Sequence, residues 1–254
     1  MGEIYVVSGV RTAIGDFGAS LKDIPPCELG STVIKEALSR ASLDGADVGH
    51  VVVGHVANTE PRDMYVSRVA SVNAGVSIET PAFNVNRLCG SGLQAIVSAA
   101  QSIMLGDASV AVAAGVENMS RAPYILPAHR FGARMGDSVA MDMMTGALSD
   151  PFEKIHMGVT AENVAKKFNI SRQEQDELAI ESHRRAIHAI ENGYFKEQIV
   201  PIVQKTRKGD VIFDTDEHAR RDITLESLSM LKPVFVRENG TVTAGNASGI
   251  NDGA

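Results

Sequence analysis

Short apolar runs alternate with amphipathic segments over roughly the first 118 residues of the chain. Runs rich in valine, isoleucine and alanine predict strands, and the amphipathic segments between them predict crossover helices. This order is typical of an α/β fold with a mostly parallel sheet flanked by helices. Because the runs lack polar alternation, we expect strands that are buried on both faces. We expect strands over 4–9, 51–56, 82–85 and 110–115, and helices over 28–41, 64–75 and 92–105.

The pattern changes after Glu117. Helical periodicity and several methionines follow, and we expect helices over 160–168 and 171–191, the second opened by the capping box SRQE. Residues 205–232 are charged and are expected to be loops, whereas 241–245 regains the character of a strand. The pattern therefore predicts an α/β core over 1–118, an α-rich loop domain over 119–240, and a return strand with the start of a further helix over 241–254.

Composition narrows the class of protein. The 254 residues are 44% hydrophobic and 22% charged, as in an ordinary globular protein. A net charge of −7 argues against nucleic acid as a partner. We expect a cytoplasmic protein with no membrane anchor, since no apolar run approaches roughly 20 residues and no leader pattern opens the chain. The two cysteines and the spacing of the histidines predict neither a disulfide framework nor a metal site.

The strongest candidate for chemistry is Cys89, within FNVNRLCGSGLQAI at 83–96. Here a predicted strand runs into a predicted helix, so the thiol would lie at a helix N-terminus, where the thiolate is favoured and backbone N–H groups can bind an oxyanion. Gly90 and Gly92 would allow a sharp turn and a close approach by substrate. The competing interpretation is an inert core cysteine. Cys27, which has no glycine-rich exit, is expected to be structural.

Five segments, in one order, resemble signatures of the thiolase family. They are NRLCGSG around Cys89, GVENMS at 115–120, HMGVTAENVA at 156–165, RKGD at 207–210 and GTVTAGNASGINDGA at 240–254. Further segments resemble the bacterial β-ketothiolases that serve polyhydroxyalkanoate synthesis; related enzymes act in fatty acid metabolism. The resemblance implies the layered thiolase-like fold, with the α-rich region as its inserted loop domain.

The resemblance also implies an activity. Cys89 would take an acyl group from one acyl-CoA, and a second acetyl-CoA would attack it to give a 3-ketoacyl-CoA; the reverse is thiolysis. Coenzyme A would be the carrier of substrate and product, with no tightly bound cofactor. The residues that match the family's coenzyme A pocket are Leu148, His156, Met157, Arg220, Ser227, Phe235, Ala244 and Ser248.

Some of these residues have plainer interpretations. His156 could be a half-buried histidine with a satisfied hydrogen bond, and Ser248 a turn or cap serine. Arg220, together with Arg221 and the basic run at 205–208, could bind coenzyme A phosphates or form solvated loops. The sequence leaves these alternatives open.

Three elements of the family's site are absent from these 254 residues: the asparagine of an NEAF segment, the histidine of a GHP segment, and the cysteine of a CxGGG segment. We therefore expect an N-terminal half with its loop domain, lacking the C-terminal half and inactive alone. The alternatives are a non-catalytic coenzyme A-binding or subunit-interaction chain, and a condensing enzyme of the ketosynthase type. Expected partners are acetyl-CoA and acyl-CoA, and either a complementary C-terminal half or further copies, since the family usually forms tetramers.

Overall fold

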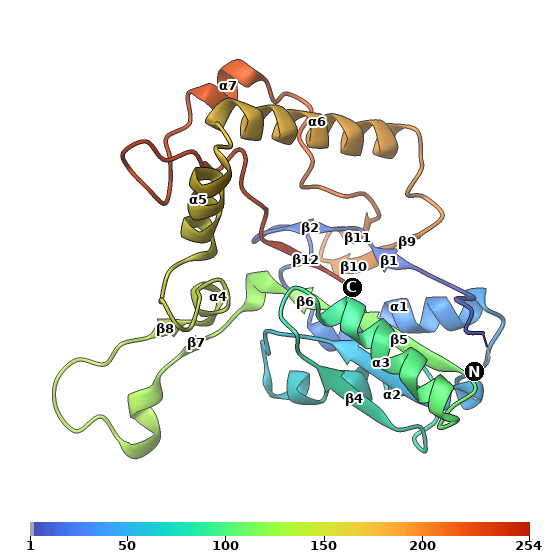
Figure 1. Ribbon diagram of the computed structural model, residues 1–254. Helices are drawn as coiled ribbons and strands as arrows, with labels where there is room; N and C mark the ends of the chain where they lie inside the picture. Colours follow the sequence, from blue (N-terminus) through green and yellow to red (C-terminus); the bar gives the residue numbers. More distant parts are fainter. Residues whose placement is uncertain (1–2) are drawn as a thin grey trace. The chain divides into compact units, whose positions relative to one another are not determined.

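The computed structural model describes residues 3–254 (Figure 1). Their contacts divide the chain into two compact units. The first unit comprises the residues up to Pro123 together with 198–216 and 250–254, and the second unit comprises 124–197 and 217–249. Helices and strands alternate in the first unit, whereas helices dominate the second, as an α/β fold with an α-rich excursion requires.

The first unit contains three α-helices, ten strands and three short 3-10 helices within its described residues. The helices are α1 (Pro26–Arg40), α2 (Val66–Asn73), α3 (Ser91–Leu105), η1 (Gly45–Asp47), η2 (Pro61–Tyr65) and η3 (Met119–Arg121). The strands are β1 (Arg11–Thr12), β2 (Gly15–Asp16), β3 (His50–Gly54), β4 (Ala82–Val85), β5 (Ala111–Gly115), β6 (Glu117–Asn118), β9 (Ile199–Val200), β10 (Ile202–Thr206), β11 (Gly209–Phe213) and β12 (Asn251–Gly253).

A parallel sheet of order β4-β3-β5 forms the centre of the first unit. Val51, Val52 and Val53 of β3 are fully buried, so the prediction of burial on both faces is confirmed for this strand. Val52 packs against Ala95 and Ala99 of α3, which crosses this sheet in Figure 1. The prediction was wrong for β4 and β5, which are only partly buried, because each flanks β3 as an outer strand of the described sheet.

Two predicted strands are wrong. Residues 4–9 form no strand: nothing in the described part of the chain pairs with them, and Tyr5, Val6 and Val7 are exposed. A β-branched run has strand propensity, but a strand also requires a partner for its backbone groups. Residues 241–245 form no strand either, because side chains bind their backbone N–H groups in place of a neighbouring strand.

The predicted loop over 205–232 was wrong in two places. β10 and β11 form an antiparallel hairpin that turns at residues 207–208, directly before Gly209, which has a positive φ of 116°. Further along, Leu225–Ser229 forms the short helix α7. The charged residues suggested a loop, but the hairpin is exposed along much of its length, and a solvated strand needs few apolar positions.

The second unit is built on helices α5 and α6. Ser171 caps α6, and Ser171 and Glu174 bind each other's backbone N–H groups, which confirms the predicted capping box. The elements of this unit are β7 (Tyr124–Ile125), η4 (Pro127–Phe131), β8 (Met141–Asp142), α4 (Met143–Ala147), α5 (Met157–Phe168), α6 (Arg172–Glu191) and α7 (Leu225–Ser229).

Candidate active site

Cys89 lies in the turn that joins β4 to α3, and it is exposed. Gly90 is the N-cap of the helix, so the thiol precedes the first turn of α3. The first N–H groups of an α-helix have no acceptor within the helix, and the helix dipole places partial positive charge there. The position predicted for a reactive thiol, at a strand-to-helix turn and open to solvent, is therefore confirmed.

The turn itself is made by Leu88, which the sequence did not indicate. Leu88 has a positive φ of 49°, a left-handed conformation that leucine rarely adopts. Gly90 has a φ of −90°, which any residue can adopt, so the expected role of this glycine in the sharp turn was wrong. A Cβ added to Gly92 would meet nothing within 4 Å, so the space beside this residue is open.

Side chains on both sides of Cys89 hold this turn. The Oγ of Ser91 accepts the N–H of Arg87 at 2.8 Å and donates to the carbonyl of Leu88 at 2.6 Å. The Oδ1 of Asn86 accepts the N–H of Leu88 at 3.0 Å. Because the buried Ser91 hydroxyl both accepts and donates a hydrogen bond, it fixes the backbone on the N-terminal side of the thiol to the first residue of α3.

Close glycine contacts bring the start of α3 against the sheet. A Cβ added to Gly54, at the end of β3, would lie 2.5 Å from the carbonyl carbon of Ser91. A Cβ added to Gly115, at the end of β5, would lie 3.3 Å from the Cα of Gly92. Because Gly54 and Gly115 have no Cβ, the first turn of α3 can rest on the carboxyl ends of two parallel strands. Active sites of α/β proteins commonly occupy this edge of the sheet.

Cys27 contrasts with Cys89. Its side chain is fully buried in α1, and its Sγ lies 3.5 Å from Oδ1 of Asp63. Burial first, and then the nearby Asp63 carboxylate, raise the pKa of the Cys27 thiol to about 12. A thiol that stays protonated at neutral pH is a poor nucleophile, which supports the structural role expected for Cys27.

The second unit gathers four of the predicted pocket residues around the start of α5. The ring of His156 stacks on Phe235 with the centroids 4.8 Å apart, and its Nδ1 accepts the N–H of Gly158 at 3.0 Å. The N–H of Met157 donates to the carbonyl of Leu148 at 2.8 Å. His156 is thus the half-buried histidine with a satisfied hydrogen bond that the plainer interpretation describes, and it also lies beside the other predicted residues.

The other four predicted residues line a pocket of about 700 Å³ in the same unit. The pocket also carries Arg221, His183 and His218, so its polar lining is mainly basic, with Asp222 as its acidic residue. The four are Arg220, Ser227, Ala244 and Ser248. The basic run at 205–208 belongs to the β10–β11 hairpin of the first unit and is not among the residues that line the pocket.

His183 is a pocket residue that the sequence did not indicate. Its Nδ1 accepts the backbone N–H of Arg220 at 3.2 Å, which requires an unprotonated nitrogen at that position. Burial, and then the nearby His218 and Arg220, lower the pKa of His183. A neutral histidine therefore helps to hold the backbone that presents Arg220.

Within residues 3–254, no group of three or more His, Cys, Asp or Glu side chains is placed to hold a metal ion.

Comparison with known proteins identifies the family to which the chain belongs. Residues 4–254 match the model of the thiolase N-terminal domain. The chain is 69% identical over 252 residues to Beta-ketothiolase BktB of Cupriavidus necator, covering 99% of this chain and 64% of that protein. It is 49% identical to the acetyl-CoA acetyltransferase of the same organism, covering all of this chain and 65% of that protein.

Solved structures give the same result. The acetyl-CoA acetyltransferase of Bacillus anthracis superposes with a TM-score of 0.93 at 45% identity, over 98% of this chain and 63% of that one. Human mitochondrial 3-ketoacyl-CoA thiolase superposes with a TM-score of 0.94 at 42% identity, with the same coverage. The chain thus spans a little under two thirds of the length of these relatives. It belongs to the thiolase family, with the family's N-terminal domain extending over residues 4–254.

Proposed function

We propose that this chain supplies the acyl-accepting half of an acetyl-CoA acetyltransferase, with Cys89 as the nucleophile. The observation that carries the proposal is the exposed Cys89 thiol, held at the start of α3 by the bound Ser91 side chain. A nucleophile needs access to its substrate and a fixed position, and Cys89 has both.

The proposed first step is transfer of an acyl group to sulfur. The Cys89 thiolate attacks the thioester carbon of an acyl-CoA, a Cys89 thioester forms, and the bond to coenzyme A breaks. Coenzyme A leaves as its thiolate and takes up the proton that Cys89 released. The N–H groups of the first turn of α3 would stabilise the oxyanion that forms between these events.

The second step joins carbon to carbon. A base takes a proton from the α-carbon of a second acetyl-CoA, and this carbon forms a bond to the carbonyl carbon of the Cys89 thioester. The bond from that carbon to sulfur breaks, 3-ketoacyl-CoA is released, and the Cys89 thiolate takes up a proton to regenerate the thiol. Thiolysis is the same sequence in reverse. Covalent catalysis divides this difficult reaction into two easier steps.

We propose that the second unit binds the coenzyme A carrier, as the predicted loop domain over 119–240 would. The pocket that contains Arg220, Ser227, Ala244 and Ser248 offers positive charge for phosphates, and guanidinium groups bind phosphate oxygens well. The cluster of Leu148, His156, Met157 and Phe235 offers an apolar surface for the pantetheine arm. No tightly bound cofactor is required.

The reaction also needs a base for Cys89 and a group that moves the α-proton. The family's histidine and second cysteine for these roles are absent from these 254 residues. We propose that a complementary C-terminal half supplies them, and that the assembled protein is a cytoplasmic homo-oligomer acting in polyhydroxyalkanoate or fatty acid metabolism. The 69% identity to a β-ketothiolase supports the proposed acyltransferase activity of the assembled protein.

Reconstitution tests the proposed function. The chain is mixed with the remaining C-terminal part of the C. necator β-ketothiolase, and cleavage of acetoacetyl-CoA by coenzyme A is followed. We expect turnover by the mixture, loss of turnover with Cys89→Ala, and retained turnover with the control Cys27→Ala. Coenzyme A binding without turnover in a well-assembled mixture would instead favour the non-catalytic binding chain.

A further inference from the structure

One face of α6 carries an arginine and an aspartate that contact two segments of the pocket wall. Arg172 and Asp176 are one helical turn apart, and the Nε of Arg172 donates to Oδ2 of Asp176 at 2.7 Å. The Asp176 side chain is 2% exposed and that of Arg172 is 23% exposed. Neither residue lines the pocket itself.

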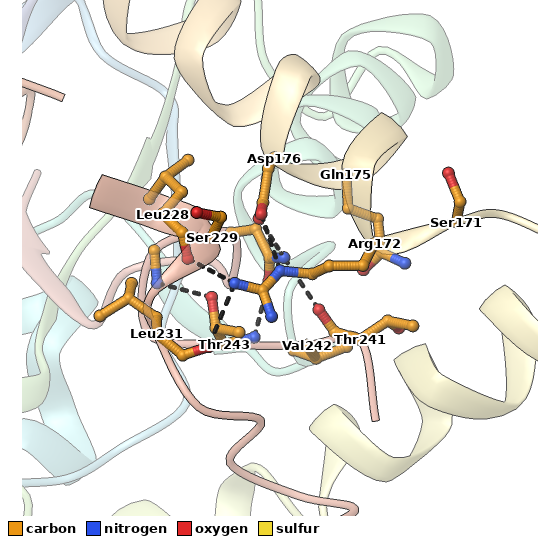
Figure 2. A network of polar contacts seen from close by, with 12 residues as sticks. Ser171, Arg172, Gln175, Asp176, Leu228, Ser229, Leu231, Thr241, Val242 and Thr243 are labelled. Carbon is orange, nitrogen blue, oxygen red and sulfur yellow. Dashed lines mark hydrogen bonds and ion pairs between the residues drawn. The ribbon is translucent and has the colours of Figure 1, made fainter. Parts of the chain in front are cut away.

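Arg172 holds the first wall segment, the end of α7. Its Nη2 donates to the carbonyls of Leu228 and Leu231 (Figure 2). Leu228 is in the last turn of α7 and Leu231 lies two residues beyond the helix, so one guanidinium group binds carbonyls on both sides of the helix end. Leu228 and Leu231 line the pocket, and Ser227 lies directly before Leu228.

Asp176 holds the second wall segment, residues 241–249. Its Oδ1 accepts the side-chain N–H of Asn246 at 2.8 Å. Asn246 in turn accepts the N–H of Thr243 at 2.7 Å and donates to the carbonyl of Thr241 at 3.0 Å, which closes the loop that carries Ala244. The same loop leads directly to Ser248.

The two segments also contact each other. A Cβ added to Gly245 would lie 2.3 Å from Cδ2 of Leu228 and 2.7 Å from Cδ1 of Leu231. The 241–249 segment therefore packs directly on the α7 segment, and displacement of either would disturb both walls. Glu162 of α5 adds a further anchor, since its carboxylate accepts the N–H groups of Thr241 and Val242.

We infer that Arg172 and Asp176 are positioning residues for the coenzyme A pocket: together they fix the α7 end and the 241–249 segment in the arrangement that presents Ser227, Ala244 and Ser248. This inference rests on the proposed function of that pocket. Its physical basis is the buried Asp176 carboxylate, which needs both Arg172 and Asn246 as partners, since an unpaired buried charge is costly. Loss of either partner therefore loosens both walls together.

Titration calorimetry of coenzyme A with the full 254-residue chain tests this inference, together with amide hydrogen exchange on the same samples. Arg172→Gln and Asp176→Asn remove the pair. Arg184→Gln is the matched control, because it removes an ion pair with Glu181 on the same helix at a position that is 66% exposed and outside the pocket. All variants are compared well below their unfolding temperatures.

For Arg172→Gln and Asp176→Asn we expect affinity for coenzyme A to fall about tenfold or more, as it does when the binding-competent population drops by that factor. Exchange should accelerate at residues 228–231 and 241–249 while protection of β3 and α3 stays unchanged, and the control should match the original chain. A purely structural role would lower global stability without this local pattern.

Unchanged coenzyme A affinity in both variants, or faster exchange spread over the whole chain, would overturn the inference. If the original chain itself fails to bind coenzyme A, the proposed function of the pocket is contradicted and the inference fails with it. The two failures are distinguishable because only the second affects the unsubstituted protein.

Discussion

At the scale of single residues, the backbone of Leu88 is the least expected feature of the site. A leucine with a φ of 49° is strained, and such strain is found most often where function requires a particular geometry. Nothing in NRLCGSG indicates it, because a sequence would normally place a glycine or asparagine at such a position. The identity of the nucleophile could be predicted from the sequence, but the residue that makes its turn could not.

Substitution of Leu88 should reveal this strain. Because the side chain is 58% exposed, its replacement removes little packing. We expect Leu88→Val to lower the free energy of unfolding by about 1 kcal/mol, since β-branched residues tolerate a positive φ poorly, and Leu88→Asn to leave stability nearly unchanged. Urea unfolding would measure both, and equal stabilities for the two variants would show that the left-handed backbone is not strained.

His183 predicts a pH dependence of stability. Burial first, and then His218 and Arg220, lower its pKa in the folded chain below the ordinary value of 6.5. As the pH falls below that value, the unfolded chain takes up a proton that the folded chain does not, so the free energy of unfolding decreases. We expect His183→Gln, which can still accept the Arg220 N–H, to reduce this decrease between about pH 7 and about pH 5.

The measurement is the urea midpoint across that range for the original chain and for His183→Gln. His188→Gln serves as the control on the same helix, because His188 does not line the pocket. Identical slopes for the original chain and His183→Gln would contradict the assigned neutral state of His183.

At the scale of elements, the sequence predicted best where local signals decide the structure. The capping box of α6 and the buried strand β3 depend on neighbouring residues and on one apolar run, and both are confirmed. The strand predictions for residues 4–9 and 241–245 were wrong because the pairing of a strand depends on residues that are far away in the sequence. The Arg172–Asp176 pair could not be predicted for the same reason, since its partners lie 56 to 70 residues further along.

The contact between β3 and α3 gives a prediction at this scale. A methyl group at Gly54 would meet the backbone of Ser91 at 2.5 Å, so either the strand or the helix would have to move. We expect Gly54→Ala to lower the free energy of unfolding by about 1–3 kcal/mol, the usual effect of overpacking a core.

Gly92→Ala is the control for Gly54→Ala, because a Cβ at that position meets nothing within 4 Å and alanine favours the helix. Thermal and urea unfolding would compare the two variants. If Gly54→Ala is as stable as the original chain, the first turn of α3 does not rest on β3 as closely as described.

At the scale of the whole molecule, the first unit exposes a large apolar surface. Leu93 and Leu105 of α3 are 68% and 78% exposed, and Tyr5, Val6 and Val7 are exposed as well. The stretch Leu88–Leu105 is long and apolar enough to cross a membrane by length and composition alone, a property that core helices of soluble proteins share. Contiguous exposed apolar surface commonly marks a protein interface.

We therefore expect the 254-residue chain to associate with itself as its concentration rises. Leu93→Glu with Leu105→Glu should weaken this association, whereas Leu178→Glu, at an equally exposed position on α6, should not. Sedimentation velocity over a concentration series would measure it. A chain that stays monomeric at every concentration would contradict the prediction.

The nucleophilic role of Cys89 is tested by trapping the acyl group on its sulfur. The chain, supplied with the C-terminal part of the C. necator relative, is mixed with acetyl-CoA, quenched in acid, digested and mapped by mass spectrometry. We expect an acetyl thioester on the peptide that contains Cys89, none on the peptide that contains Cys27, and removal of the label by added coenzyme A. Acetylation elsewhere, or none on Cys89 in a mixture that turns over acetoacetyl-CoA, would contradict it.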